Sequence, residues 1–158
     1  MVTAKDDKKR LFERINNKIQ FLKSYSKSQS LTEAEQLIAN YETILKTDPK
    51  DKEKWMNLGR AYDKRFNFEK AIESKLAAKQ LNPNDPEVHF SLGCSFCAKG
   101  DFLSAIESYR EALRCKPDFA EACSSIGEQY VIIGDGEKAD LWFGKAQEIR
   151  FRKGKMKP

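Results

Sequence analysis

Residues 55–62 read Trp55-Met56-Asn57-Leu58-Gly59-Arg60-Ala61-Tyr62, and this stretch decides the fold. Its large apolar residues at 55, 58 and 62 have the spacing of one buried stripe along a helix. The leucine-glycine pair returns 34 residues later as Leu92-Gly93, and after another 34 residues as Ile126-Gly127. An aromatic residue follows each of these glycines by three positions. A motif that returns at a fixed period of this length indicates a chain built from stacked structural repeats.

The second half of each repeat keeps the same period. One alanine follows each glycine by twelve residues and another comes seven later, at Ala71, Ala105 and Ala139, and at Ala78, Ala112 and Ala146. Between the two halves, Asn67, Asp101 and Asp135 occupy equivalent positions, where their side chains suit the N-cap of a second helix. Pro83 and Pro117 close the first two units, because proline cannot continue a helix. Each unit is therefore predicted to be a pair of helices.

These residues resemble the tetratricopeptide repeat family, whose 34-residue units carry W-x2-L-G-x2-Y followed by A, F, A and P. The resemblance covers a repeat domain over 31–149, with a partial unit at 31–51 and full units at 52–85, 86–119 and 120–150. It implies an all-α, right-handed superhelical solenoid of antiparallel helix pairs. The sequence departs from the family pattern at Lys75, which replaces an aromatic residue and whose stem we expect over apolar surface. His89 and Cys123 replace the tryptophan.

The net charge of +5 is concentrated at the two ends. Residues 1–30 carry eight basic and three acidic side chains, and residues 150–158 carry five basic and no acidic ones. We expect 1–30 to be a basic segment containing an amphipathic helix, and 150–158 to be a basic tail. These ends either solubilise the chain or contact an acidic partner. There is no apolar run long enough to span a membrane and no apolar signal core, so a cytoplasmic location is expected.

The resemblance implies protein binding, because stacked units of this kind form an extended concave surface. We expect an adaptor or co-chaperone-like scaffold that holds a partner peptide or helix in a groove lined by the first helices. The expected groove residues are Met56, Asn57, Arg60, Lys64, Phe90, Ser91, Cys94, Cys97, Ser124, Ser125, Glu128, Val131 and Ile132. Their apolar members favour a ligand with apolar anchors. Alternatively, Phe90, Val131 and Ile132 only complete the packing of the helices.

Some members of the family grip a C-terminal carboxylate with Lys, Asn and Arg side chains. Asn57 matches one such place, but Glu87 and Ser91 stand at others, and Glu121 and Ser125 replace the basic pair of the third unit. A buried carboxylate needs charged donors to offset its desolvation. We therefore expect no carboxylate clamp.

The sequence contains no set of residues suited to catalysis, so we expect no enzyme activity, no cofactor and no metal site. Cys94 and Cys97 form a CxxC, but inside a predicted helix, whereas metal-binding pairs usually converge across a turn. The G-x-G-x-x-A of residues 134–139 has no acidic residue about twenty positions on, as a nucleotide site requires. His89 is expected to be a core or cap residue.

Two alternatives from other classes remain open. One is nucleic-acid binding through the basic ends, although their charges are not spaced along one face. The other is a homodimer through the C-terminal end, because Trp142 stands where the earlier units have Ser74 and Ser108 and is expected to face outward. Trp142 and Phe151 are therefore candidates for a second interface. Otherwise the last helix runs on and buries Phe151, or this end is a free tail.

Overall fold

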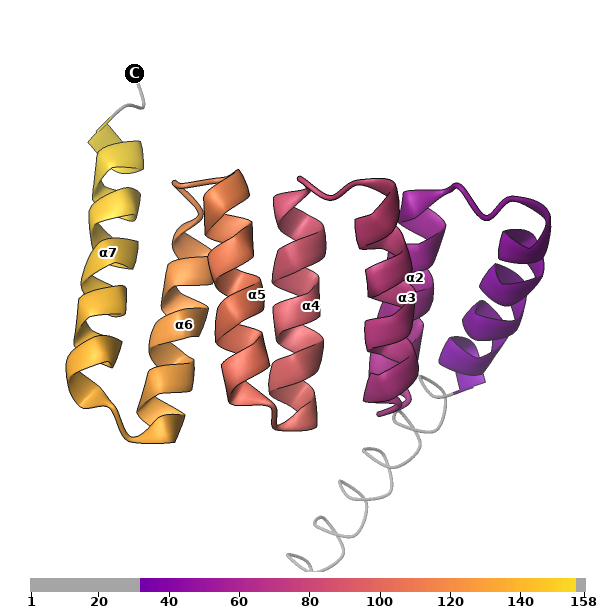
Figure 1. The fold of residues 1–158 in the computed structure, drawn as a ribbon, viewed down its shortest axis with the longest axis horizontal. Helices are drawn as coiled ribbons and strands as arrows, with labels where there is room; N and C mark the ends of the chain where they lie inside the picture. Colours follow the sequence, from indigo (N-terminus) through magenta and orange to yellow (C-terminus); the bar gives the residue numbers. More distant parts are fainter. Residues whose placement is uncertain (1–31, 156–158) are drawn as a thin grey trace, which may run out of the picture.

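The computed structural model describes residues 32–155, and every regular element within them is a helix (Figure 1). A first helix covers residues 32–47. The others are α2 (Lys52–Lys64), α3 (Phe68–Leu81), α4 (Pro86–Lys99), α5 (Phe102–Cys115), α6 (Ala120–Ile133) and α7 (Gly136–Lys155). The predicted basic segment at 1–30 lies outside the described residues. No helix in the described range is long and apolar enough to cross a membrane.

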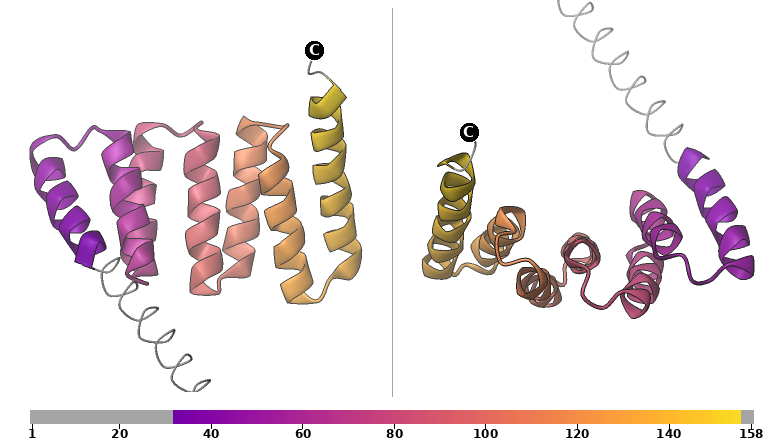
Figure 2. Two further views of the ribbon diagram at one scale, coloured as in Figure 1. Left: turned by 180° about the vertical axis from the view of Figure 1, so that it is seen from behind. Right: turned by 90° about the horizontal axis from the view of Figure 1, so that it is seen from above.

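The helices pack as consecutive pairs, α2 with α3, α4 with α5 and α6 with α7. Neighbouring pairs meet through α3 and α4 and through α5 and α6. The right-hand view of Figure 2 shows the pairs side by side in a curved row. The 32–47 helix joins this row through Leu45, which is buried with Leu58 and Tyr62 of α2. The predicted all-α solenoid of helix pairs is therefore confirmed.

The turns inside the three units have one geometry. The predicted N-caps are confirmed, since the side chains of Asn67, Asp101 and Asp135 each accept a hydrogen bond from the backbone three residues on. The residue before each cap has a left-handed backbone conformation. In the second and third units it is Gly100 or Gly134, each with φ of 89°, where glycine carries no steric penalty. The first unit places Phe66 at the same position with φ 58°. A bulky side chain in that region is strained.

The position of the family's tryptophan also has a repeated role. Trp55 Nε1 donates to the carbonyl of Pro49 at 2.8 Å, and a ring nitrogen of His89 lies 2.7 Å from the carbonyl of Pro83. These two carbonyls are 34 residues apart, so each ring ties the start of its unit to the end of the one before. His89 is 3% exposed, which confirms that it is a core residue.

Within each unit a glycine on the first helix receives a side chain from the second. A Cβ at Gly93 would lie 2.4 Å from the ring of Tyr109, and one at Gly127 would lie 2.8 Å from Phe143. Gly59 faces Lys75 in the same way, with a Cβ placed 2.8 Å from the lysine Cγ. The glycines therefore allow the helices of a pair to approach closely.

The C-terminal end differs from the expected tail, because α7 continues as a helix to Lys155. The proline that closes the earlier units is absent here, so nothing stops the helix. Polar contacts also support the extension: Arg150 donates to Ser124 Oγ at 2.9 Å, Lys153 pairs with Asp118 at 2.9 Å, and Arg152 pairs with Glu148 one turn earlier. Phe151 remains 63% exposed, so the longer helix does not bury it.

Candidate functional site

The predicted groove residues lie on α2, α4 and α6, the first helices of the three units. We call their exposed and half-buried members the first-helix face: Asn57, Arg60, Lys64, Phe90, Ser91, Cys94, Cys97, Ser124, Ser125, Glu128, Val131 and Ile132. Met56 does not belong to it. Its side chain is 2% exposed and packs with Ile72, Val88 and Leu92. The prediction for Met56 was wrong because α2 buries one side against its own unit and another against the next.

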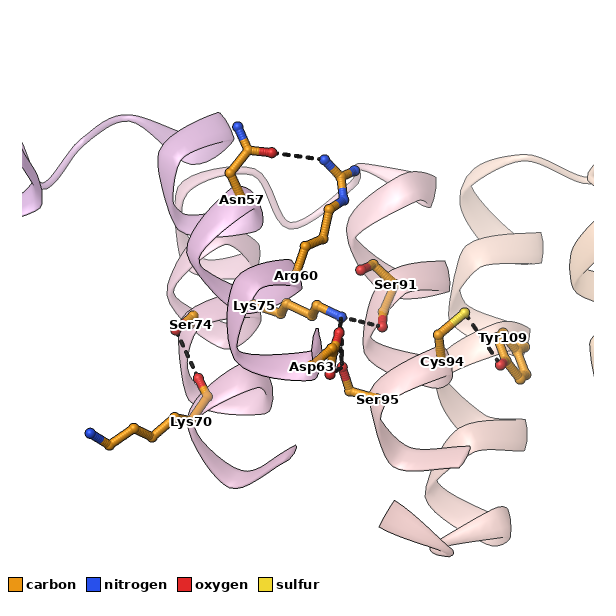
Figure 3. Close-up of polar contacts among 10 residues, drawn as sticks. All are labelled: Asn57, Arg60, Asp63, Lys70, Ser74, Lys75, Ser91, Cys94, Ser95 and Tyr109. Atoms are coloured by element: carbon orange, nitrogen blue, oxygen red, sulfur yellow. Dashed lines mark hydrogen bonds and ion pairs between the residues drawn. The ribbon is translucent and has the colours of Figure 1, made fainter. Parts of the chain in front are cut away.

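The α2 part of the face is polar and basic. Arg60 and Lys64 are exposed. Arg60 donates to Oδ1 of Asn57 at 2.9 Å, one turn earlier on the same helix (Figure 3). Because that contact lies at the surface, the Arg60 guanidinium keeps further donors for a ligand. This end of the face therefore suits an acidic group.

The α4 part combines a packing ring with two thiols. Phe90 is half-buried, with its ring centroid 5.3 Å from that of Tyr109 and 4.9 Å from that of Phe119. Phe90 therefore packs mainly in the core, which agrees with the alternative that it completes the packing of the helices. Cys94 is exposed and accepts a weak hydrogen bond from the Tyr109 hydroxyl at 3.6 Å, whereas Cys97 is half-buried against the core.

The α6 part is the most apolar. Val131 and Ile132 are 58% and 55% exposed, so most of their surface is not used in packing. Glu128 is exposed one turn before them. The Ser124 hydroxyl accepts from Arg150, so this side chain is engaged within the chain, and the Ser125 backbone carbonyl accepts from Gln129. Exposed aliphatic residues next to one another are the strongest sign of a docking surface on this face.

A buried lysine lies beneath the face between the first and second units. Lys75 comes from α3, is 1% exposed, and extends its ammonium between α2 and α4 (Figure 3). Its Nζ lies 2.5 Å from Asp63 Oδ2, 2.6 Å from Ser95 Oγ and 3.0 Å from the Ser91 carbonyl. Ser95 also donates to Asp63 Oδ1 at 2.8 Å. The three donors of the ammonium are therefore all used, and one carboxylate balances its charge.

The sequence predicted only that the Lys75 stem lies over apolar surface, and the structure adds that its ammonium binds acceptors inside the protein. The other members of this network, Asp63 and Ser95, were not among the predicted site residues. The sequence did hold a signal, since a lysine at an aromatic position opposite Gly59 needs an acid within reach. Asp63 lies one turn after Gly59 on that helix.

The junction of the second and third units has other side chains at the equivalent positions. Tyr109 replaces the lysine, Cys97 the aspartate and Gln129 the second serine, each 34 residues on. Burial and the nearby Cys94 and Cys97 thiols raise the pKa of Tyr109. Cys94 is exposed as a residue, but the protein around its sulfur desolvates the thiol and raises its pKa, so this thiol is not an activated nucleophile. Gln129 is 2% exposed, and its Oε1 has no hydrogen-bond partner among the described residues.

Within residues 32–155, no group of three or more His, Cys, Asp or Glu side chains is arranged to hold a metal ion.

Trp142 and Phe151, the candidates for a second interface, differ in exposure: Phe151 is exposed and Trp142 is half-buried. Trp142 packs against the core of the last two units, with the Lys145 ammonium 4.1 Å from its ring centroid. Trp142 was expected to face outward because its equivalents in the earlier units are serines. That inference was weak, because Ser74 is itself only 4% exposed. Its hydroxyl bonds to the Lys70 carbonyl of its own helix at 2.8 Å, so the position tolerates burial. The packing of the chain itself therefore accounts for much of the Trp142 ring.

Comparison with known proteins agrees with the repeat. Sequence models of the tetratricopeptide repeat match residues 55–85 and residues 86–119. A search of curated protein sequences finds no significant match. The chain is a tetratricopeptide-repeat protein, and repeats of this family indicate protein partners. The family is generally non-catalytic.

Several solved structures share the fold. A crystal structure of MamA superposes with a TM-score of 0.73 at 23% sequence identity, over 98% of this chain and 99% of that one. The structure of MamA MSR-1 gives 0.68 at 25% identity, over 76% and 69% of the two chains. MamA from Desulfovibrio magneticus RS-1 gives 0.71 at 19% identity, over 77% and 69%. These structures share the fold, and the repeats support a protein-interaction scaffold.

Proposed function

We propose that the chain is a non-catalytic adaptor or co-chaperone-like scaffold that holds a partner peptide or helix against the first-helix face. The observation that carries this proposal is the exposure of Val131 and Ile132, at 58% and 55%, on a helix whose other side is buried. A partner that covers these two side chains removes their apolar surface from water. Each Å² removed contributes about 25 cal/mol of favourable free energy.

The charges of the face give the partner an orientation. Arg60 and Lys64 lie at the α2 end, while Glu128 lies next to the apolar residues at the α6 end. A partner with apolar anchors over α6 and an acidic residue over α2 matches both ends. Such charge matching contributes more to specificity and to the association rate than to affinity.

The test compares the proteins retained by three forms of the full chain on an affinity matrix. The groove form carries Val131→Asp and Ile132→Asp, which place charge where apolar anchors would dock. The control form carries Leu103→Asp on α5, because Leu103 is 72% exposed and lies outside the face. Phe90→Ala is a poorer probe, since Phe90 packs against two rings and its loss acts through stability.

We expect a specific set of proteins to bind the unchanged chain and the Leu103→Asp form, and to be lost from the groove form. In a second arm, Arg60→Ala with Lys64→Ala weakens retention and reduces its dependence on salt. Retention of the same proteins in the same amounts by all three forms would refute binding at the first-helix face.

A further inference from the structure

A cavity of ≈ 620 Å³ opens between the 32–47 helix, α2 and α3. It lies on the opposite side of α2 from the first-helix face. The α2 residues that line it are Trp55, Leu58 and Tyr62, whereas those of the first-helix face are at 57, 60 and 64. An offset of two residues turns a side chain by about 200° around a helix. The cavity is therefore separate from the proposed partner-binding surface.

The cavity exists because small residues face a diverging helix. Ser74 and Ala77 of α3 line one wall, and neither side chain is long enough to reach the opposite one. The 32–47 helix forms the other wall and diverges from α2 toward its carboxyl end (Figure 1). The space between the walls falls in the range of about 300–1,000 Å³ that is typical of small-molecule sites.

The floor of the cavity is apolar and fixed. Leu45, Leu58 and Tyr62 are 5%, 3% and 7% exposed, so their positions are set by the core. Trp55 is half-buried, and its indole N–H already donates to the Pro49 carbonyl at 2.8 Å. The indole ring therefore presents only apolar surface to the cavity.

Charged groups are divided unequally between the two ends. At the Tyr62 end, the hydroxyl donates to Glu42, and the Lys70 ammonium lies 5.3 Å from the ring centroid. Burial, Glu42 and Glu73 together raise the pKa of Tyr62 to about 12, so both carboxylates act on this end. Lys46 follows Glu42 by one helical turn, toward the Trp55 end. It is exposed and forms no ion pair with a residue of the described range.

We propose that this cavity binds an anionic amphiphile, with its apolar body on Trp55 and Leu58 and its acid group at Lys46. At the Tyr62 end the two glutamates outnumber the Lys70 ammonium, so the net charge there is negative and repels an acid group, and the ligand enters in one orientation. An apolar body with a single acid group is the chemistry of both fatty acids and aromatic acids. The site is independent of the proposed partner binding, because no residue is shared between the two surfaces.

The experiment uses the full chain with Trp142→Phe, so that Trp55 is the one remaining tryptophan of the two in the sequence. Dodecanoate, kept below its micelle concentration, and anilinonaphthalene sulfonate are titrated separately while Trp55 fluorescence is followed. We expect a saturable change with at least one of them. A response to dodecanoate alone identifies acyl acids, and a response to the dye alone identifies aromatic acids. No saturable change with either acid overturns the proposal.

Two comparisons test where and how the ligand binds. Lys46→Ala is expected to weaken binding of the acid about fivefold, as for one exposed ion pair. Dodecanol, which has the same chain without the charge, is expected to bind more weakly than dodecanoate. If dodecanol binds as tightly as dodecanoate, or Lys46→Ala changes nothing, the assignment of the acid group to Lys46 is wrong.

Ala77→Phe fills the cavity and is expected to abolish binding. Its matched control is Glu111→Phe, at the equivalent position of α5, which is expected to bind as the unchanged chain does. Circular dichroism verifies that both forms are folded, and Lys46→Ala gives an independent result if Ala77→Phe is not. Unaltered binding by a folded Ala77→Phe form places the ligand elsewhere. The Val131→Asp and Ile132→Asp form should bind both acids normally, which separates this site from the partner surface.

Discussion

At the junction of the first and second units, a lysine from α3 places its ammonium between α2 and α4. At the next junction, 34 residues on, Tyr109 of α5 reaches the corresponding place with a phenol ring. The first junction is held by Lys75, Asp63 and Ser95 through charge-assisted hydrogen bonds. The second is held by ring packing, and its one polar orphan in the described structure is Gln129 Oε1.

The comparison shows that one helical frame accepts two opposite chemistries at the same position. The glycine on the first helix makes this possible, because Gly59 and Gly93 both leave room for whatever the second helix sends across. The two solutions differ in their sensitivity to damage. Removing either partner of a buried ion pair leaves an uncompensated charge and costs much of the stability at once. Trimming an apolar contact costs stability in proportion to the atoms removed.

The largest expected effect comes from Asp63→Asn. This change keeps the shape of the side chain but leaves the Lys75 ammonium, 1% exposed, without a counter-charge. We expect a loss of about 3 kcal/mol in the free energy of unfolding, measured by urea denaturation. Asp118→Asn, which breaks the exposed pair with Lys153, serves as control and should cost less than about 1 kcal/mol. Equal losses in the two variants would mean that the buried ion pair contributes no more to the free energy of unfolding than the exposed one.

Gly93→Ala probes the apolar junction. The new Cβ would lie 2.4 Å from the Tyr109 ring, and we expect a cost of about 2 kcal/mol from overpacking. Gly59→Ala places its Cβ 2.8 Å from the Lys75 Cγ and 3.1 Å from the Ala71 carbonyl oxygen, a less severe overlap that should cost about 1 kcal/mol. In a Tyr109→Ala background the glycine substitution should be almost neutral, as a double-mutant cycle would show. A cost that persists without the ring would assign the effect to the backbone instead.

Phe66 tests whether the first unit carries backbone strain that the others avoid. Phe66→Gly and Phe66→Ala both remove the ring, which lies edge-on to Phe68 at 6.2 Å. Only glycine is free of strain at φ 58°. The glycine variant should therefore be more stable than the alanine variant by about 1 kcal/mol in thermal or urea unfolding. Identical stabilities would show that the turn relaxes at no cost.

The smallest net change is expected when the ion pair of the first junction is replaced by the corresponding residues of the second. Lys75→Tyr with Asp63→Cys removes both charges at once, and Gly59 already leaves room for the ring. Replacing a buried ion pair by well-packed residues is often neutral, so stability should stay within about 1 kcal/mol of the unchanged chain. A loss as large as that of Asp63→Asn would show that the two junctions differ in shape as well as in chemistry.

Much of the fold could be predicted from the sequence because its signals are local and repeated. The 34-residue period places the helix pairs, and the caps at Asn67, Asp101 and Asp135 need only the residues that follow them. The prediction failed where packing between units decides. Met56 turned inward because α4 covers it, and the partners of Lys75 lie on two other helices.

The candidate site was predictable only in part. The exposure of Arg60, Val131 and Ile132 follows from their places on the first helices, while partner binding at the first-helix face stays a prediction. The cavity beside Trp55 could not be foreseen, because it depends on the tilt of the 32–47 helix. Periodicity describes which side of a helix is buried, but not the angle at which two helices meet.

Lys75 also has a consequence for the order in which the units assemble. It belongs to the first unit, but Ser91 and Ser95, two of its three acceptors, belong to the second. Until α4 docks, the ammonium can stay hydrated at little cost. Docking removes that water, and the loss is compensated only if the acceptors arrive in the right places. A slip of α4 by one turn would leave the ammonium paired with Asp63 but without two of its three acceptors, so the lysine favours the correct stacking register of α4 while the chain folds.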